Sequence, residues 1–275
     1  MSRARREIDV AVDGGMLRVG LWEADSPDAP TALLIHGVTS SHLAWLDVVE
    51  RLPHMRLVAP DLRGRGRSNA VAGSAGMTAH AADMVAVLDA LAIEHAVVVG
   101  HSMGAFAAVV LADLHRERVD ALVLIDGGLP LDMPAGIDPE TAAAHVLGPT
   151  AERLRMRFAS TEEYFAFWRG HPAFRQAWSP ALEEYLAYDL DDDGAGGFRP
   201  ATSYTTVIDD TVDMNAGTAV RTALERLSPP TWLLTVPRGL QDEPPGLYAP
   251  DHLARVLAGH SRIMHTRMKA STTTR

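Results

Sequence analysis

The sequence predicts an α/β protein, in which a mostly parallel central sheet carries helices on both faces and is interrupted by an inserted helical cap. Short, uniformly apolar segments alternate with helical patterns in the first part of the chain. This alternation is typical of a parallel sheet that is covered on both sides. It stops near residue 129 and resumes near residue 229. We therefore expect a core of residues 1–128 and 229–275 and a cap of residues 129–228.

The core segment before the predicted cap contains a hairpin followed by strand and helix signals. Alternating apolar residues at 8–12 and 17–22 flank Gly14-Gly15, which predicts a β-hairpin. Beyond a linker at residues 27–30, apolar runs predict buried strands at residues 32–35, 57–59, 96–99 and 121–125. Apolar residues at helical spacing predict helices at residues 42–51, 78–91 and 102–115.

The predicted cap has a different pattern. Aromatic residues at helical spacing, such as Tyr164, Phe165 and Trp168, predict helices of the cap whose aromatic side chains form a core between the cap and the sheet, with the lining of a binding pocket as the alternative. Residues 191–197, rich in Asp and Gly, lack the ligand spacing of a calcium loop and predict a flexible solvated turn. A last strand–helix–strand unit is then expected at residues 231–236, 250–258 and 262–268.

Composition excludes several classes of function. The 275 residues contain no cysteine, so disulfides, thiolate metal sites and cysteine nucleophiles are absent. A net charge of −10 argues against a nucleic-acid partner. No apolar run approaches the roughly 18 residues of a membrane span and no secretory signal is visible, so we expect a cytoplasmic protein without a membrane partner. The sequence contains no metal-ligand or nucleotide-binding motif, so we expect a protein that uses no metal and no cofactor.

The strongest catalytic signal is Gly100-His101-Ser102-Met103-Gly104, a G-x-S-x-G motif between a predicted strand and a predicted helix. In that context the glycines allow a tight turn that exposes the hydroxyl of Ser102 as a nucleophile. A helix N-terminus directly after the serine supplies free amide groups and positive potential. The alternative interpretation is a glycine-rich turn with a serine N-cap.

A second signal, His36-Gly37-Val38, follows the first predicted central strand. A glycine there lets the backbone bend so that the amide of Val38 faces a developing oxyanion, with the amide of Met103 as its partner. The alternative is a simple strand-to-loop turn. We expect His36 itself to be a structural hydrogen-bonding residue.

These motifs, together with Asp61-Leu62-Arg63-Gly64-Arg65-Gly66-Arg67-Ser68, resemble the α/β-hydrolase fold family. The resemblance covers residues 31–128 strongly and 229–258 more weakly. It implies an active site built from Ser102, an acid and a histidine in that chain order. It also implies that residues 61–68 are structural, with their arginines beside the entrance of the site. A serine at position 102, where the dehalogenase and epoxide-hydrolase branches carry aspartate, argues against those branches.

Two carboxylates compete for the role of the acid. Asp242 lies in Gly239-Leu240-Gln241-Asp242 after the late strand and resembles the family's G-x-x-D loop, which makes it the preferred candidate. Asp126 ends the earlier strand, at a position that some members of the family use instead. For either residue the alternative is a loop carboxylate that accepts backbone hydrogen bonds.

The histidine that the resemblance implies is missing from its expected place. The family carries it just after the last strand, but residues 270–275 read Ala-Ser-Thr-Thr-Thr-Arg, and His260 and His265 flank or lie within the strand. Codons AAC CAC TAC ACG for Asn-His-Tyr-Thr, read one base later, give Thr-Thr-Thr-Arg. The single lysine of the chain, Lys269, immediately precedes this stretch. We therefore expect a frame-shifted or truncated C-terminus that has lost the base.

The sequence as a whole predicts a cofactor-free serine hydrolase whose substrate is a small carboxylic ester. Lactones, thioesters and carbon–carbon cleavage of diketones remain open, as does the oligomeric state. The alternative is a catalytically impaired relative, or a protein that binds a small apolar ligand. The missing histidine favours this alternative, because a serine without a base is a poor nucleophile.

Overall fold

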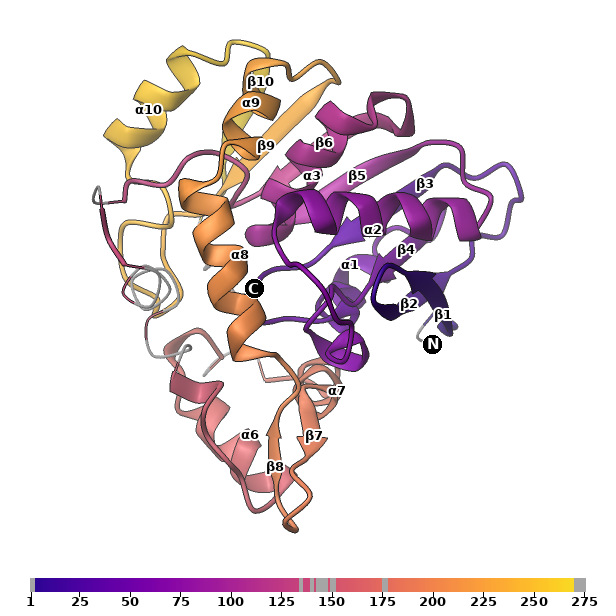
Figure 1. Cartoon of the computed structure of the whole chain (residues 1–275), viewed down its shortest axis with the longest axis vertical. Helices are drawn as coiled ribbons and strands as arrows, with labels where there is room; N and C mark the ends of the chain where they lie inside the picture. The colour runs from indigo at the N-terminus through magenta and orange to yellow at the C-terminus, as the bar shows by residue number, and fades with distance from the viewer. Residues whose placement is uncertain are drawn as a thin grey trace.

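The computed structural model describes residues 3–133, 136–138, 141, 148, 152–174 and 178–269. An eight-stranded sheet forms its centre (Figure 1). In spatial order the sheet consists of β1 (Arg6–Val12), β2 (Gly15–Trp22), β4 (Arg56–Pro60), β3 (Thr31–Ile35), β5 (Ala96–His101), β6 (Val119–Ile125), β9 (Thr231–Thr235) and β10 (Ile263–Arg267). β2 is antiparallel to β1 and β4, whereas all other neighbouring strands are parallel. The predicted α/β fold with a mostly parallel sheet is confirmed.

The two faces of the sheet are buried by different helices. Leu33 and Ile35 of β3 point to the face that is covered by α2 (Met77–Ala90), α3 (Met103–Leu114), α9 (Ala219–Glu225) and α10 (Pro250–Ala258). Ala32 and Leu34 alternate with them and point to the opposite face, which is covered by η1 (His42–Trp45) and α1 (Leu46–Val49). This alternation follows from the two-residue period of a strand. Both faces of β3 are therefore buried, as its continuous apolar sequence predicts.

The second face is less covered at the end of the sheet that contains β9 and β10. Trp232 of β9 and Met264 of β10 lie opposite each other in the parallel register. Their exposed fractions are 40% and 46%, while Leu233 and Ile263 on the other face are buried. An apolar pair on β9 and β10 therefore faces solvent.

Between β6 and β9 the chain forms a separate layer below the sheet in Figure 1. It contains α6 (Thr161–Arg169), η4 (Pro172–Phe174), α7 (Pro180–Tyr188), β7 (Leu190–Asp192), β8 (Phe198–Pro200) and α8 (Tyr204–Ala216). Two short helices, η2 (Gly66–Ser68) and η3 (Arg116–Arg118), lie in loops earlier in the chain. Serines at the N-caps of α6, α7 and α8 accept a hydrogen bond from the amide three residues later, which explains where these helices begin. The turn predicted at residues 191–197 forms the tip of the β7–β8 hairpin, and residues 191 and 192 belong to β7.

Aromatic side chains give this layer its own core. Tyr164, Phe165 and Trp168 of α6 cluster with Phe158, Phe174, Leu186 and Leu190. By contrast, Met214 near the end of α8 and the buried residues of α9 belong to the core of the sheet. The chain therefore rejoins the sheet core along α8, before the end of the predicted cap.

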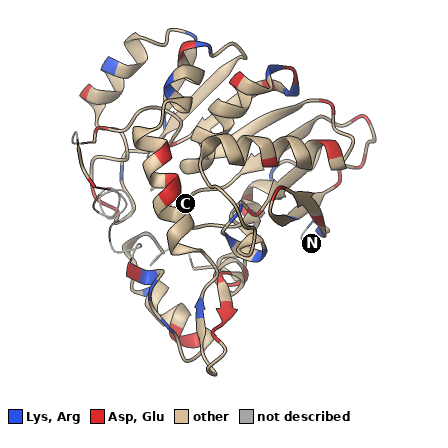
Figure 2. Cartoon of the chain, in the orientation of Figure 1, with Lys and Arg blue, Asp and Glu red and all other residues tan. Residues whose placement is uncertain are grey.

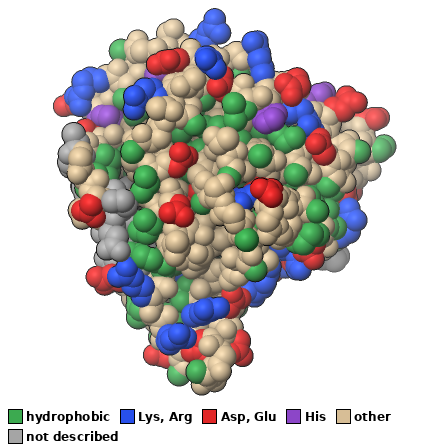
Figure 3. All heavy atoms as spheres, in the orientation of Figure 1, with side chains coloured by type: hydrophobic (Ala, Val, Ile, Leu, Met, Phe, Trp, Pro, Cys, Tyr) green, Lys and Arg blue, Asp and Glu red, His purple; other side chains and the backbone are tan. Residues whose placement is uncertain are grey.

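The charged residues are mixed in sign along the chain. Figure 2 shows acidic but no basic residues along α8, and residues of both signs on the other helices and loops. On the face drawn in Figure 3, basic, acidic and apolar side chains are interspersed without a broad basic patch. Among the described residues, none of the helices combines the length and the apolar character that a membrane span requires.

The start of α3 packs directly on the end of β3. A Cβ atom added at Gly104 would overlap with the carbonyl oxygens of Ile35 and His36. We predict that Gly104→Ala lowers the free energy of unfolding by about 1–3 kcal/mol, because the helix must move away from the strand. Urea denaturation measures this effect. Gly259→Ala, where the nearest atom is 3.5 Å from the added Cβ, is the matched control and should stay within about 0.5 kcal/mol of the wild type. Equal losses in the two variants would contradict this account.

Candidate active site

Ser102 occupies a strained turn between a strand and a helix. β5 ends at His101 and α3 begins at Met103, and Ser102 between them has φ 52° and ψ −121°. This backbone conformation costs free energy in a residue that carries a side chain. The amide of Ser102 donates to the carbonyl oxygen of Ile125 on the neighbouring strand β6 (2.8 Å). The turn predicted from the G-x-S-x-G motif is therefore present, and Ser102 lines a cavity.

Glycines surround this turn because other backbone segments pass too close for a side chain. A Cβ at Gly100 would overlap with the first turn of α3, and a Cβ at Gly127 would overlap with the carbonyl oxygen of Ser102. A Cβ at Gly37 would lie 3.3 Å from the Cβ of Ser102. The carboxyl ends of β3, β5 and β6 therefore meet at Ser102.

The two residues predicted to form an oxyanion hole lie on either side of this meeting point. Val38 follows Gly37 at the end of β3 and lines the same cavity as Ser102. Met103 is buried and is the first residue of α3, so its amide is one of those that the helix itself leaves unpaired. The structure brings both residues to the same end of the sheet as Ser102.

His36 links the end of β3 to the loop after β4. Its Nδ1 donates to the carbonyl oxygen of Gly37 (2.7 Å), and its Nε2 accepts a hydrogen bond from the amide of Leu62 (3.0 Å). The ring is completely buried, and burial lowers the pKa of His36 to about 3. A neutral ring with one donor and one acceptor fits these two bonds, which is the structural role expected from the sequence.

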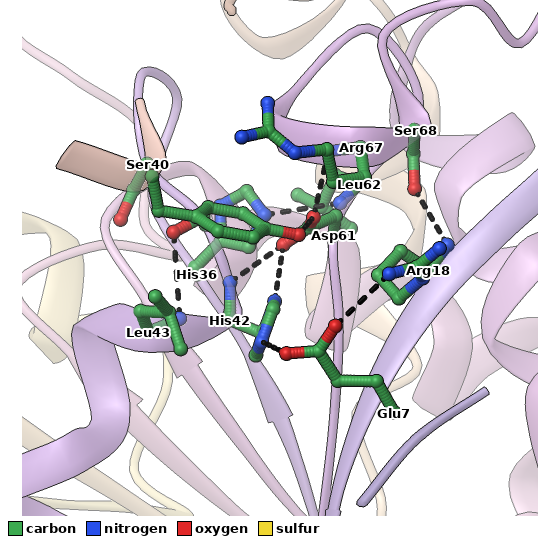
Figure 4. A network of polar contacts seen from close by, with 12 residues as sticks. Glu7, Arg18, His36, Ser40, His42, Leu43, Asp61, Leu62, Arg67 and Ser68 are labelled. Atoms are coloured by element: carbon green, nitrogen blue, oxygen red, sulfur yellow. Dashed lines mark hydrogen bonds and ion pairs between the residues drawn. The ribbon is translucent and has the colours of Figure 1, made fainter. Parts of the chain in front are cut away.

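Asp61 is the centre of a buried network in the same loop (Figure 4). One oxygen accepts from the amide and the Nδ1 of His42 (both 2.8 Å). The other accepts from the amide of Arg67 (2.9 Å) and the hydroxyl of Tyr188 at the end of α7 (2.7 Å). Burial would raise the pKa of Asp61, but the hydrogen bond and charge of His42 outweigh it, and the net pKa is lowered. This carboxylate therefore joins the core to the layer that contains α7.

Asp126 directly follows β6 and is completely buried. It has a φ of 46°, and its amide donates to the carbonyl oxygen of Leu234 (2.7 Å). Its carboxylate lies 3.5 Å from the amide of Val236. Because the next residue, Gly127, packs on the backbone of Ser102, Asp126 lies on the strand end beside the serine.

Asp242 lies in the loop after β9 and has a different environment. Its Oδ1 is 2.7 Å from Nε of Arg238, and its side chain is 42% exposed. Gln241 and Glu243 on either side of it line the cavity, whereas neither Asp242 nor Asp126 is among the described lining residues. Asp242 is therefore paired with Arg238 at a half-exposed position of this loop.

The candidate histidines near the last strand also lie away from the cavity. His265 is in β10, and its Nε2 is 2.9 Å from the hydroxyl of Thr235. Neither His265 nor His260 is among the described cavity-lining residues. Residues 271–275, where the resemblance places the base, are outside the described residues.

Two other histidines, His101 and His171, do line the cavity. Nε2 of His171 lies 3.1 Å from Nε2 of Gln241, and burial lowers the pKa of this histidine. His171 belongs to no motif, and its sequence signal is its position two residues after the end of the aromatic helix at residues 161–169.

The cavity has a volume of about 870 Å³ and lies between the carboxyl ends of the strands and the layer of α6 and α7. Its described lining is largely apolar, with side chains such as those of Val38, Leu43, Trp45, Leu46, Trp168, Phe174, Leu182 and Tyr185. Four carboxylates also line it, those of Asp47, Asp132, Asp189 and Glu243, and the described lining contains neither lysine nor arginine. Within the described part of the chain, no three or more His, Asp or Glu residues cluster as metal ligands.

Comparisons with known proteins agree with this architecture. A sequence model of the family described as "alpha/beta hydrolase fold" matches residues 30–193, more than half of the chain. Lipase LipV of Mycobacterium tuberculosis is 36% identical over 131 residues, which are 46% of this chain and 50% of the lipase. A putative carbamate hydrolase, RutD of Agrobacterium fabrum, is 29% identical over 64% of each chain. The chain thus spans less than two thirds of either relative.

Solved structures extend the similarity of fold to almost the whole chain. A thioesterase domain from the curacin biosynthetic pathway superposes with a TM-score of 0.76 at 21% identity. The superposition covers 99% of this chain and 95% of that domain. At this level of identity the likeness concerns the fold.

The buried His36 gives a test of the interactions beneath the site. In the unfolded chain this histidine titrates near its usual pKa of 6.5, whereas in the fold its pKa is about 3. Between these values the unfolded state binds more protons, so stability is lost as the pH falls, by up to about 1.4 kcal/mol per pH unit. We predict that the difference in unfolding free energy between wild type and His36→Gln shrinks from about pH 7 to about pH 4.5. Urea denaturation at both pH values measures it, and a constant difference would contradict the lowered pKa.

Proposed function

Because the chain belongs to the α/β-hydrolase fold family, we propose that it is a cofactor-free serine hydrolase that acts on carboxylic esters. The observation that carries this proposal is Ser102, held in a strained strand-to-helix turn at the wall of an apolar cavity. This geometry is that of a nucleophile elbow. The similarity to a lipase supports esters as the substrate class.

In the proposed reaction, the hydroxyl oxygen of Ser102 attacks the ester carbonyl carbon while a base takes its proton. The amides of Val38 and Met103 donate to the oxyanion of the tetrahedral intermediate. The base returns the proton to the departing alkoxide, which leaves as the alcohol, and an acyl-serine remains. Water then releases the carboxylic acid by the same steps.

We propose Asp126 rather than Asp242 as the carboxylate that orients the base. Asp126 is buried on the strand end beside Ser102. A triad carboxylate is typically buried and accepts a hydrogen bond from the histidine. Asp242 is half-exposed and bound to Arg238, so its charge is already compensated outside the cavity. The environments of the two residues therefore favour the candidate that the sequence ranks second.

A second candidate function is that of a catalytically impaired relative or a protein that binds a small apolar ligand. Its support is the placement of His260 and His265, which lie away from the cavity. Loss of the catalytic histidine in subtilisin lowers turnover by roughly 10⁶-fold. The proposal therefore has two parts that can be tested separately, a serine with its oxyanion hole and the base that activates it.

We predict slow phosphonylation of Ser102 by a fluorophosphonate, measured by intact mass, and slow hydrolysis of short p-nitrophenyl esters. If the chain supplies no base of its own, imidazole should accelerate Ser102-dependent turnover by at least about tenfold, since it can act as a general base beside the serine. The rate measured with Ser102→Ala gives the hydrolysis by imidazole in solution, and this background is subtracted from the wild-type rate. Asp126→Asn should reduce the stimulation, because the carboxylate orients the added base, whereas Asp242→Asn should leave it unchanged.

Three results would contradict these predictions. Rapid turnover without imidazole would refute a missing base and point to a histidine of this chain, with His260 and His265 as the first variants to test. A stimulation that depends on Asp242 instead of Asp126 would reverse the assignment of the acid. A Ser102 that stays inert to the fluorophosphonate with and without imidazole would favour the ligand-binding alternative.

The charges of the cavity lining predict selectivity among esters. Of its four acidic lining residues, Asp189 is paired with Arg153, whereas Asp47, Asp132 and Glu243 have neither lysine nor arginine beside them in the described lining, so a negative charge on the substrate is repelled. We predict that p-nitrophenyl butyrate has a kcat/KM at least about tenfold above that of p-nitrophenyl hemisuccinate, which differs by its carboxylate. Added salt should reduce the ratio of the two kcat/KM values, because it screens the repulsion between the carboxylates of the cavity and that of the substrate. Equal values at low salt would show that the carboxylates do not face the substrate.

A further inference from the structure

A buried arginine contacts both residues of the proposed oxyanion hole. Arg65, in the loop after β4, has no exposed surface. Its Nε donates to the carbonyl oxygen of Val38 (2.8 Å), and its Nη2 lies 3.5 Å from the sulfur of Met103. Its Nη1 donates to the carbonyl oxygen of Arg63 (2.9 Å) and to the carboxylate of Asp210. The sequence placed this arginine beside the entrance of the site, whereas the structure places it behind the oxyanion hole.

The charge of Arg65 is balanced by one residue of α8. Asp210 is completely buried and also accepts from the amide of Gly76 (2.6 Å) and from Nε2 of His80 (3.0 Å). Burial would raise the pKa of Asp210, but the charges of His80 and Arg65 outweigh it and keep the carboxylate ionised. A buried arginine without such a partner would be strongly unfavourable. The orientation of the guanidinium therefore depends on the position of α8.

The same helix also contributes to the apolar cluster on which Val38 packs. Val207, three residues before Asp210, is completely buried in a small cluster with Leu154, and Val38 packs against that cluster. Residues three apart lie on the same side of a helix. One side of α8 thus supports Val38 twice, through the Val207 cluster and through the ion pair of Arg65.

We propose that Arg65 is a positioning residue that holds Val38 and Met103 in the geometry of the oxyanion hole, and that α8 locks it in place through Asp210. This inference rests on the proposed serine chemistry. A hydrogen bond to the Val38 carbonyl fixes the peptide that follows this residue, and so restricts the direction in which the preceding amide points. The contact with the Met103 side chain holds the start of α3 against the same guanidinium.

The chain offers a matched control in Arg63. This residue belongs to the same loop, is buried, and forms a two-bond ion pair with Asp83 (2.8 and 2.7 Å). The remaining side-chain bonds of Arg63 go to the carbonyl oxygens of Ala72, Ser74 and Asp13. Arg63→Met therefore removes a comparable buried ion pair that does not touch Val38 or Met103.

The experiment compares Arg65→Lys, the double variant Arg65→Met with Asp210→Asn, and Arg63→Met, each as the full chain. Fluorophosphonate labelling of Ser102, with imidazole present, gives a maximal rate constant and a half-saturating concentration for the folded protein. We expect the maximal rate constant to fall by about 10- to 100-fold in both Arg65 variants with little change in half-saturation, since loss of one oxyanion donor costs about 10²–10³-fold. Lysine retains the charge beside Asp210 but not the planar fork that reaches Val38 and Met103.

Hydrogen exchange of the segment around Val38 gives a readout that does not need catalysis. Exchange there should accelerate in both Arg65 variants and stay unchanged in Arg63→Met. Unchanged exchange with labelling rates within twofold of the wild type would overturn the positioning role, as would equal losses of rate in Arg63→Met. If Ser102 of the wild type is not labelled at all, the proposed function falls, and exchange alone then decides whether Arg65 holds Val38.

Discussion

The site depends on a steric constraint at Ser102, where three strand ends come closer together than side chains would allow. Gly100, Gly104 and Gly127 each lie where an added Cβ would overlap with backbone atoms. The left-handed backbone of Ser102 can persist because these contacts hold it from several sides. The same contacts bring Val38, Met103 and Asp126 to one end of the sheet, although they come from three different elements.

The fold was predictable because its signals are local. Apolar runs at 32–35 and 121–125 correspond to β3 and β6, which begin one and two residues earlier. The β7–β8 hairpin was missed because two three-residue strands carry almost no periodic signal. Strand order was not derivable from periodicity, since it depends on which segments pair across the sheet.

The site was predictable where a motif fixes the backbone and not where distant segments meet. Ser102, Val38 and Met103 each belong to a glycine-containing turn whose motif spans only a few residues. Sequence spacing could not decide between Asp126 and Asp242, because the decision depends on Arg238 and on the burial of each carboxylate. The burial of Arg65 was equally inaccessible, since its partner Asp210 is 145 residues away.

Tyr188 of the inserted segment binds the core through the carboxylate of Asp61, which other residues of the core already hold in place. Asp61 is held by His42 and Arg67 within the core, and Tyr188 adds a single hydroxyl donor from α7. Arg67 and Arg65 of the same loop also pair with Asp191 of β7 and Asp210 of α8, so a different inserted segment would have to supply one donor and two carboxylates to attach in the same way. The loop after β4 therefore restricts which inserted segments, and so which cavity shapes, this sheet can carry.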